Sequence, residues 1–84
     1  MSENELAKLA VDVCFKIHTR LGPGLLESVY EEIVEYELRK LNLFIERQKD
    51  LPVNWDNLKL EKGYRADLII ERKLLMELKS VEQI

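Results

Sequence analysis

Residues 64–81 read YRADLIIERKLLMELKSV and contain two apolar stretches separated by a short charged connection. The alternation within each stretch is typical of β-strands, so the pattern predicts strands at Tyr64–Glu71 and Leu74–Val81. If the apolar side chains of both strands are to share one face, the hairpin must pair Leu68 with Met76. A slip of one residue would move every side chain to the other face, so the pattern specifies this register.

The same register places Asp67 opposite Glu77 on the other face of the hairpin. Directly opposed Cβ atoms lie about 4.5–5.5 Å apart, and two carboxylates that close repel each other unless a cation or a proton lies between them. A Mg²⁺ ion with ligands at about 2.0–2.1 Å fits such a gap. Lys79 projects from the same face and could orient or deprotonate an attacking water. Asp67, Glu77 and Lys79 are therefore our candidate catalytic residues for metal-assisted phosphodiester hydrolysis.

Two amphipathic helices are expected before the hairpin. Apolar residues recur at three- and four-residue steps over residues 2–21, and a capping-box pattern begins at Ser2. The turn at residues 22–24, Gly-Pro-Gly, ends this helix, because proline cannot continue the hydrogen-bond ladder. A second helix is predicted over Leu25–Leu41 and closes at Asn42, a residue type that tolerates left-handed backbone.

The period of the apolar residues then changes from that of a helix to that of a strand. Residues 43–49 predict a first strand, and residues 51–53 an extended segment with proline at an edge or bulge. Residues 54–62 are ambiguous, with a turn expected at Asp56-Asn57. Two helices packed on an antiparallel meander make an α+β fold, and the absence of any linker predicts one domain over residues 1–84.

Composition narrows the class of protein. The chain has 84 residues, 46% of them hydrophobic, and a net charge of −3, which is typical of a globular protein. A single cysteine excludes a disulfide scaffold, and no apolar run approaches the roughly 18 residues of a membrane span. We therefore expect a cytoplasmic protein without membrane contact. Residues 1–42 hold five Lys/Arg and eight Asp/Glu, which argues against a simple basic module that coats nucleic acid.

The segment at residues 21–30, LGPGLLESVY, is more distinctive than the strand acids. With His18 before it and the residues Tyr-Arg-Ala-Asp at 64–67 after it, the chain resembles the GxxExxY family over essentially its whole length. This is a set of small prokaryotic proteins of the PD-(D/E)XK nuclease-like superfamily. The resemblance implies a Mg²⁺- or Mn²⁺-dependent nuclease that acts on DNA or RNA.

The hairpin acids are also similar to the superfamily signature. Asp67 followed by Glu-Leu-Lys at residues 77–79 resembles the D…ExK pattern, with Ala66 where the signature has proline. Glu27 stands where the family motif has its glutamate. The resemblance thus implies that Glu27 joins Asp67 and Glu77 as a third metal ligand.

The resemblance further implies an α-β-β-β-α-β core, with a helix carrying a glutamine and a last strand after the ExK strand. The chain ends at Ile84, so we expect a partial core that lacks this helix and strand. Uncovered apolar residues such as Leu75 and Val81 favour a homodimer or higher oligomer. The competing hypothesis is a catalytically inactive remnant that acts as a dimerisation or protein-interaction module.

Each candidate also has a purely structural interpretation. Glu27 at a helix start is explained by the helix dipole, worth roughly 0.3–1 kcal/mol. Glu31 and Glu35, on the same helix, are expected in solvent. Asp67 and Lys79 could instead form surface ion pairs with Arg65 and Glu77, worth about 0–1 kcal/mol. His18 has no partner at metal or catalytic spacing, and we assign it no role.

Overall fold

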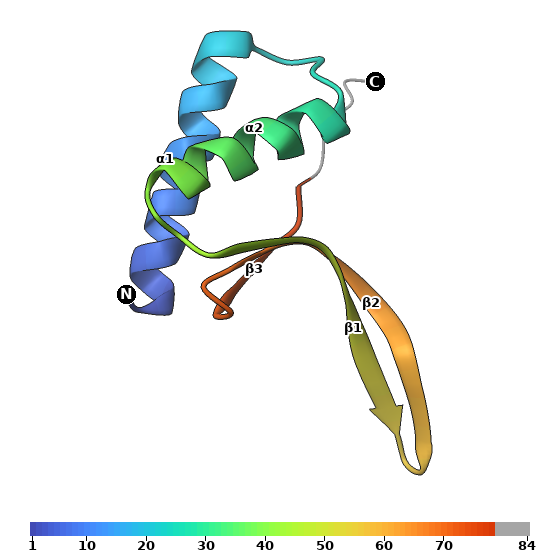
Figure 1. Cartoon of the computed structure of the whole chain (residues 1–84). Coiled ribbons are helices and arrows are strands. Elements are labelled where there is room, and N and C mark those ends of the chain that lie inside the picture. Colours follow the sequence, from blue (N-terminus) through green and yellow to red (C-terminus); the bar gives the residue numbers. More distant parts are fainter. Residues whose placement is uncertain (79–84) are drawn as a thin grey trace.

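The computed structural model describes residues 1–78 and shows two helices followed by a three-stranded antiparallel sheet (Figure 1). This arrangement confirms the predicted α+β class. The elements are α1 (Glu3–Leu21), α2 (Glu27–Lys40), β1 (Ile45–Trp55), β2 (Leu58–Ile70) and β3 (Leu74–Met76).

The ends of the helices follow the predicted signals closely. At the start of α1, the Glu5 amide donates to Ser2 Oγ at 3.2 Å, and the Ser2 amide donates to Glu5 Oε1 at 3.0 Å. Gly22, at φ +70°, ends α1. The second helix begins two residues later than predicted because Leu26 has an extended backbone, at φ −61° and ψ 140°. Asn42, at φ +61°, takes the expected left-handed conformation after α2.

The sheet has the order β1-β2-β3, so β2 is its central strand. Leu68 pairs with Met76, which confirms the predicted register of the hairpin. The ambiguous segment 54–62 forms the end of a long β1–β2 hairpin, which turns at Asp56 with φ +53°. The predicted turn is therefore confirmed, while β2 begins earlier than the predicted Tyr64.

β3 is shorter than the predicted strand Leu74–Val81. It ends at Met76, and the next amide hydrogen bond in this region does not go to the backbone of β2. The Leu78 amide donates instead to Asp67 Oδ2 at 2.7 Å. The Asp67 side chain thus accepts the hydrogen bond that the Leu78 amide would donate to the backbone of β2 if the ladder continued. The rest of the predicted strand, residues 79–84, lies outside the described residues.

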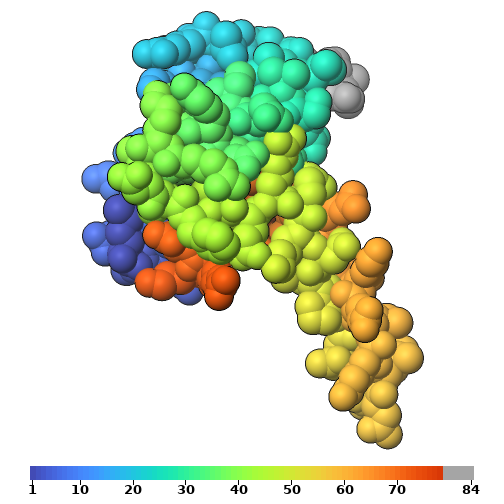
Figure 2. All heavy atoms as spheres, in the orientation of Figure 1, coloured from blue at the N-terminus to red at the C-terminus, as the bar shows by residue number. Residues whose placement is uncertain are grey.

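The core lies between the two helices and one face of the sheet. Its fully buried side chains come from α1, α2 and β2, and they are Leu6, Val34, Leu38, Leu68 and Ile70. Burying a side chain of this size contributes about 1.5–3 kcal/mol. The core stops partway along the β1–β2 hairpin, whose far part projects away from the helices (Figures 1 and 2). No helix in residues 1–78 has the length and apolar character needed to cross a membrane.

Candidate functional site

Asp67 lies on the central strand β2, next to the end of β3. Its chain neighbours Ala66 and Leu68 are buried in the sheet, while Asp67 itself is half-buried on the other face. Oδ2 accepts the hydrogen bond from the Leu78 amide at 2.7 Å. Because Leu78 is anchored in the core, this bond holds the carboxylate against the chain just after Glu77.

Glu77 follows β3 directly and its side chain is exposed. The observed ladder ends at the pair Leu68–Met76, one step before Asp67 and Glu77. Both acids therefore lie at the same end of the β2–β3 pair, where a continuation of the register would oppose them. Lys79, the third candidate catalytic residue, lies outside the described residues.

Glu27 is the first residue of α2 and is exposed. Within residues 1–78, no group of three or more His, Cys, Asp or Glu side chains is close enough to hold a metal ion. The described residues thus do not gather Glu27, Asp67 and Glu77 into one cluster. Their role as metal ligands stays a prediction.

Glu31, one turn after Glu27, is the acid that sequence reasoning misplaced. We expected it in solvent, yet it is only 4% exposed. Oε1 accepts hydrogen bonds from Arg47 Nε at 2.8 Å and from Gln48 Nε2 at 2.8 Å. A buried carboxylate persists only when it is paired in this way. A signal was available in the sequence, since Glu31 lies on the same helical stripe as the buried Val34 and Leu38.

The partners of Glu31 lie on β1, beside the strand that carries Asp67. Arg47 also donates to Glu32 and Glu35. Its hydrogen bonds to the three carboxylates raise the pKa of Arg47, and the bond to Glu32 has the largest effect, followed by that to Glu31. Gln48 has φ +52°, a left-handed conformation that is unfavourable for a long side chain such as glutamine. Its hydrogen bonds to Glu31 offset that strain and stabilise this backbone conformation within β1.

Arg65 does not pair with the strand acids among the described residues. Its guanidinium lies 3.7 Å from the Asp50 carboxylate across the β1–β2 hairpin, where Arg65 is exposed and Asp50 half-buried. The expected alternative, in which Arg65 neutralises Asp67, is therefore not what the structure shows. A surface pair of this kind contributes about 0–1 kcal/mol.

The tyrosine of the GxxExxY segment joins the two helices. The Tyr30 ring centroid lies 5.2 Å from that of His18, with the planes inclined at 51°. Burial, together with the neighbouring Cys14 thiol, raises the pKa of Tyr30. Because its ring packs against His18 of α1, we assign Tyr30 to helix packing.

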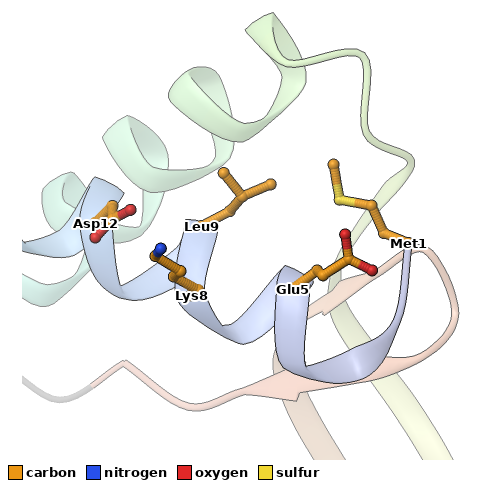
Figure 3. Close-up of a pocket in the computed structure, with 5 residues that line it drawn as sticks. All are labelled: Met1, Glu5, Lys8, Leu9 and Asp12. Carbon is orange, nitrogen blue, oxygen red and sulfur yellow. The ribbon is translucent and has the colours of Figure 1, made fainter.

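A hollow of about 400 Å³ lies on the surface of α1, and Figure 3 shows the side chains that line it. They are Met1, Glu5, Lys8, Leu9 and Asp12. None of them is a candidate residue of the sequence analysis, and all come from the N-terminal half of α1 or from the residue at the chain start. The hollow is therefore separate from the strand acids.

The fold is consistent with a partial PD-(D/E)XK domain: two helices, an antiparallel sheet, and carboxylates where β2 meets the end of β3. The family model of the PD-(D/E)XK nuclease superfamily matches residues 4–84. The chain therefore belongs to the PD-(D/E)XK nuclease superfamily. Comparisons with curated proteins and with solved structures gave no significant match.

Proposed function

We propose that this protein is a Mg²⁺- or Mn²⁺-dependent nuclease that hydrolyses phosphodiester bonds in DNA or RNA. Its superfamily supports the proposal, because PD-(D/E)XK nucleases generally use divalent metals. The observation that carries it is the Asp67 carboxylate, held by the Leu78 amide beside the exposed Glu77.

The donor set suits a hard cation, since the candidate ligands are all carboxylates. Asp67 has a preset orientation, because one of its oxygens accepts a fixed backbone hydrogen bond. Glu77 is accessible to both metal and substrate, and Glu27 is the proposed third ligand. A bound Mg²⁺ would supply Lewis-acid stabilisation of the phosphate charge. The ammonium of Lys79 would orient the attacking water or offset that charge.

Paramagnetic Mn²⁺ tests the site without relying on activity. In wild-type protein, Mn²⁺ should broaden the backbone amide signals of residues 67 and 77 before those of other exposed acids. Asp67→Asn keeps an acceptor for the Leu78 amide and should abolish this preference. Asp50→Asn is the matched control, because Asp50 is, like Asp67, a half-buried β-strand carboxylate, here paired with Arg65, and it should change nothing at residues 67 and 77.

The result that would contradict the proposal is a folded protein whose amides at 67 and 77 show no preferential broadening at saturating Mn²⁺. Cleavage assays then complete the test. Wild-type protein should cut labelled DNA or RNA in Mg²⁺ and lose this activity in chelator, whereas Asp67→Asn should be inactive in both.

A second candidate function, an inactive protein-interaction module, is favoured by a different observation. Trp55 and Tyr64 on the β1–β2 hairpin are strongly exposed, at 72% and 66%. Large exposed apolar side chains of this kind mark interaction surfaces. The chelator-sensitive cleavage assay separates the two functions, because an inactive module would cut neither DNA nor RNA in Mg²⁺.

A further inference from the structure

The far part of the β1–β2 hairpin, residues 50–65 and here called the arm, has one apolar and one polar face. Directly opposed residues of an antiparallel pair share a face. Three cross-strand pairs are apolar on both sides: Leu51–Tyr64, Val53–Leu60 and Trp55–Leu58. The pairs Asp50–Arg65 and Asn54–Lys59 are polar. The arm therefore has the alternating pattern of a sheet with one buried face. Among the described residues, however, nothing covers its apolar face.

The arm projects from the body of the molecule (Figures 1 and 2). A two-stranded ribbon by itself is marginally stable in water, so an apolar face here calls for a partner. The strands are nonetheless closely fitted. Val53 occupies the space above Gly63, where even a Cβ atom would lie only 2.6 Å from Val53 Cβ. This close fit holds the Val53 side chain against β2.

The charge of the arm argues for a partner that is also apolar. Residues 50–65 contain three Lys/Arg and three Asp/Glu, so the arm has no net charge. Binding to a nucleic-acid backbone needs an excess of cations. Aliphatic side chains also outnumber aromatic ones on the apolar face, whereas stacking with bases needs rings. These features favour a protein surface.

The face of the arm, rather than its edge, is suited to this contact. β1 is an edge strand of the described sheet, and edge strands can pair with another chain. Pro52, however, has no N–H to donate, and the β1–β2 register shifts between Leu51 and Val53. Both features interrupt a regular ladder along the arm, so edge pairing is disfavoured.

We propose that the arm is the contact surface of a homodimer, in which the apolar faces of two arms pack on each other about a two-fold axis. Such a contact is self-complementary, since each copy offers the same uncharged apolar face. With large side chains exposing about 100–200 Å² each, two arms would bury on the order of 1,000 Å², near the lower limit for a specific interface. This inference is independent of the proposed nuclease activity.

The test compares two leucines with nearly equal exposure on different surfaces. Leu60 on the arm is 46% exposed, and Leu75 on β3 is 47% exposed. Sedimentation velocity should show wild-type dimer at high concentration. Leu60→Lys should weaken dimerisation at least tenfold, and Leu75→Lys should change it less than twofold. Leu58→Lys, on the same arm face, should match Leu60→Lys and serves if that variant does not fold.

Trp55 gives a second readout, because it is the only tryptophan. Its emission should shift to shorter wavelength as the wild-type protein dimerises, and should not shift in Leu60→Lys. A wild-type protein that stays monomeric at all concentrations would overturn the proposal, as would a dimer that Leu75→Lys dissociates and the arm variants do not. Quenching of Trp55 by a single-stranded oligonucleotide, without dimerisation, would assign the arm to nucleic acid and overturn it too.

Discussion

The β1–β2 hairpin has a first half, residues 45–49 and 66–70, and a second half, which is the arm at residues 50–65. Both halves are paired antiparallel strands, but they differ in how far their side chains are buried. In the first half, Ile45 pairs with Ile70 and both are buried beneath the helices. In the second half, Trp55 pairs with Leu58 and both are exposed. Alternation in a sequence therefore specifies which side chains share a face, but not whether anything covers that face. Whether the apolar face of the hairpin is buried depends on how far α1 and α2 extend along the sheet.

The largest expected effect is a difference in stability between two leucine-to-alanine substitutions on β2, one in each half of the hairpin. Leu68 is fully buried in the first half, and Leu60 is 46% exposed in the second. Leu68→Ala should lower the free energy of unfolding by about 2–5 kcal/mol, because it leaves a cavity in the core. Leu60→Ala should lower it by about 1 kcal/mol or less. Urea unfolding at low protein concentration measures both, and equal losses would contradict the contrast between the halves.

The second prediction concerns the polar contact that holds the first half under α2. Glu31→Gln should cost about 1–3 kcal/mol, because the buried carboxylate accepts from both Arg47 and Gln48. Glu32→Gln is the matched control, since Glu32 contacts the same arginine from an exposed position. It should cost about 0–1 kcal/mol. A Glu31→Gln protein as stable as wild type in urea would show that the Glu31 carboxylate does not stabilise the fold.

The accuracy of sequence reasoning differs between local and distant contacts. The capping box at Ser2 and the turn at Asp56 depend on residues within one turn, and both are confirmed. The Leu68–Met76 register follows from alternation in adjacent strands. The place of Glu31 on the buried stripe of α2 is a local signal, but its partner Arg47 lies 16 residues away on another element. Local patterns cannot show such a partner.

In the candidate site, too, contacts between neighbouring segments were easier to predict than contacts between distant elements. The predicted register is confirmed as far as the pair Leu68–Met76, and Asp67 and Glu77 are the next residues on the two chain segments. That the two acids oppose each other stays a prediction. The hydrogen bond from the Leu78 amide to Asp67 was not foreseen, because it requires the strand to end early. The place of Glu27 relative to these acids depends on how α2 packs on the sheet. Spacing along the chain carries no information on that packing.

A third prediction tests the close fit within the arm. Gly63→Ala should destabilise the arm by about 1–2 kcal/mol, because the added methyl group collides with the Val53 side chain. Amide hydrogen exchange should rise in residues 50–65 and stay unchanged in Ile70 and its neighbours. Val53→Gly combined with Gly63→Ala should restore part of that protection, because it removes the Val53 Cβ atom that the new methyl group would meet. Loss of protection throughout the sheet would contradict the independence of the two halves.

The smallest expected effect lies in the helices that cover the first half. Lys16 of α1 and Lys40 of α2 each place Nζ 2.7 Å from the Glu37 carboxylate. Their hydrogen bonds lower the Glu37 pKa from 4.5 to about 2. A lowered folded-state pKa means that the ion pairs stabilise the fold above about pH 4.5 and are lost as the pH falls towards 2.

Glu37→Gln should therefore lower Tm slightly at pH 7 and leave it nearly unchanged at pH 2. Thermal melts of both proteins at the two pH values measure the difference. A penalty of equal size at both pH values would show that Glu37 acts through packing rather than charge.

The position of Trp55 at the end of the arm also determines what different spectroscopic probes would report. Tryptophan fluorescence senses the exposed half of the hairpin, whereas far-ultraviolet circular dichroism is dominated by α1 and α2. Two unfolding curves recorded with these probes need not coincide. Non-coincident curves are commonly interpreted as a populated intermediate. In this protein they would arise from local opening of a projecting ribbon while the helical body stays folded.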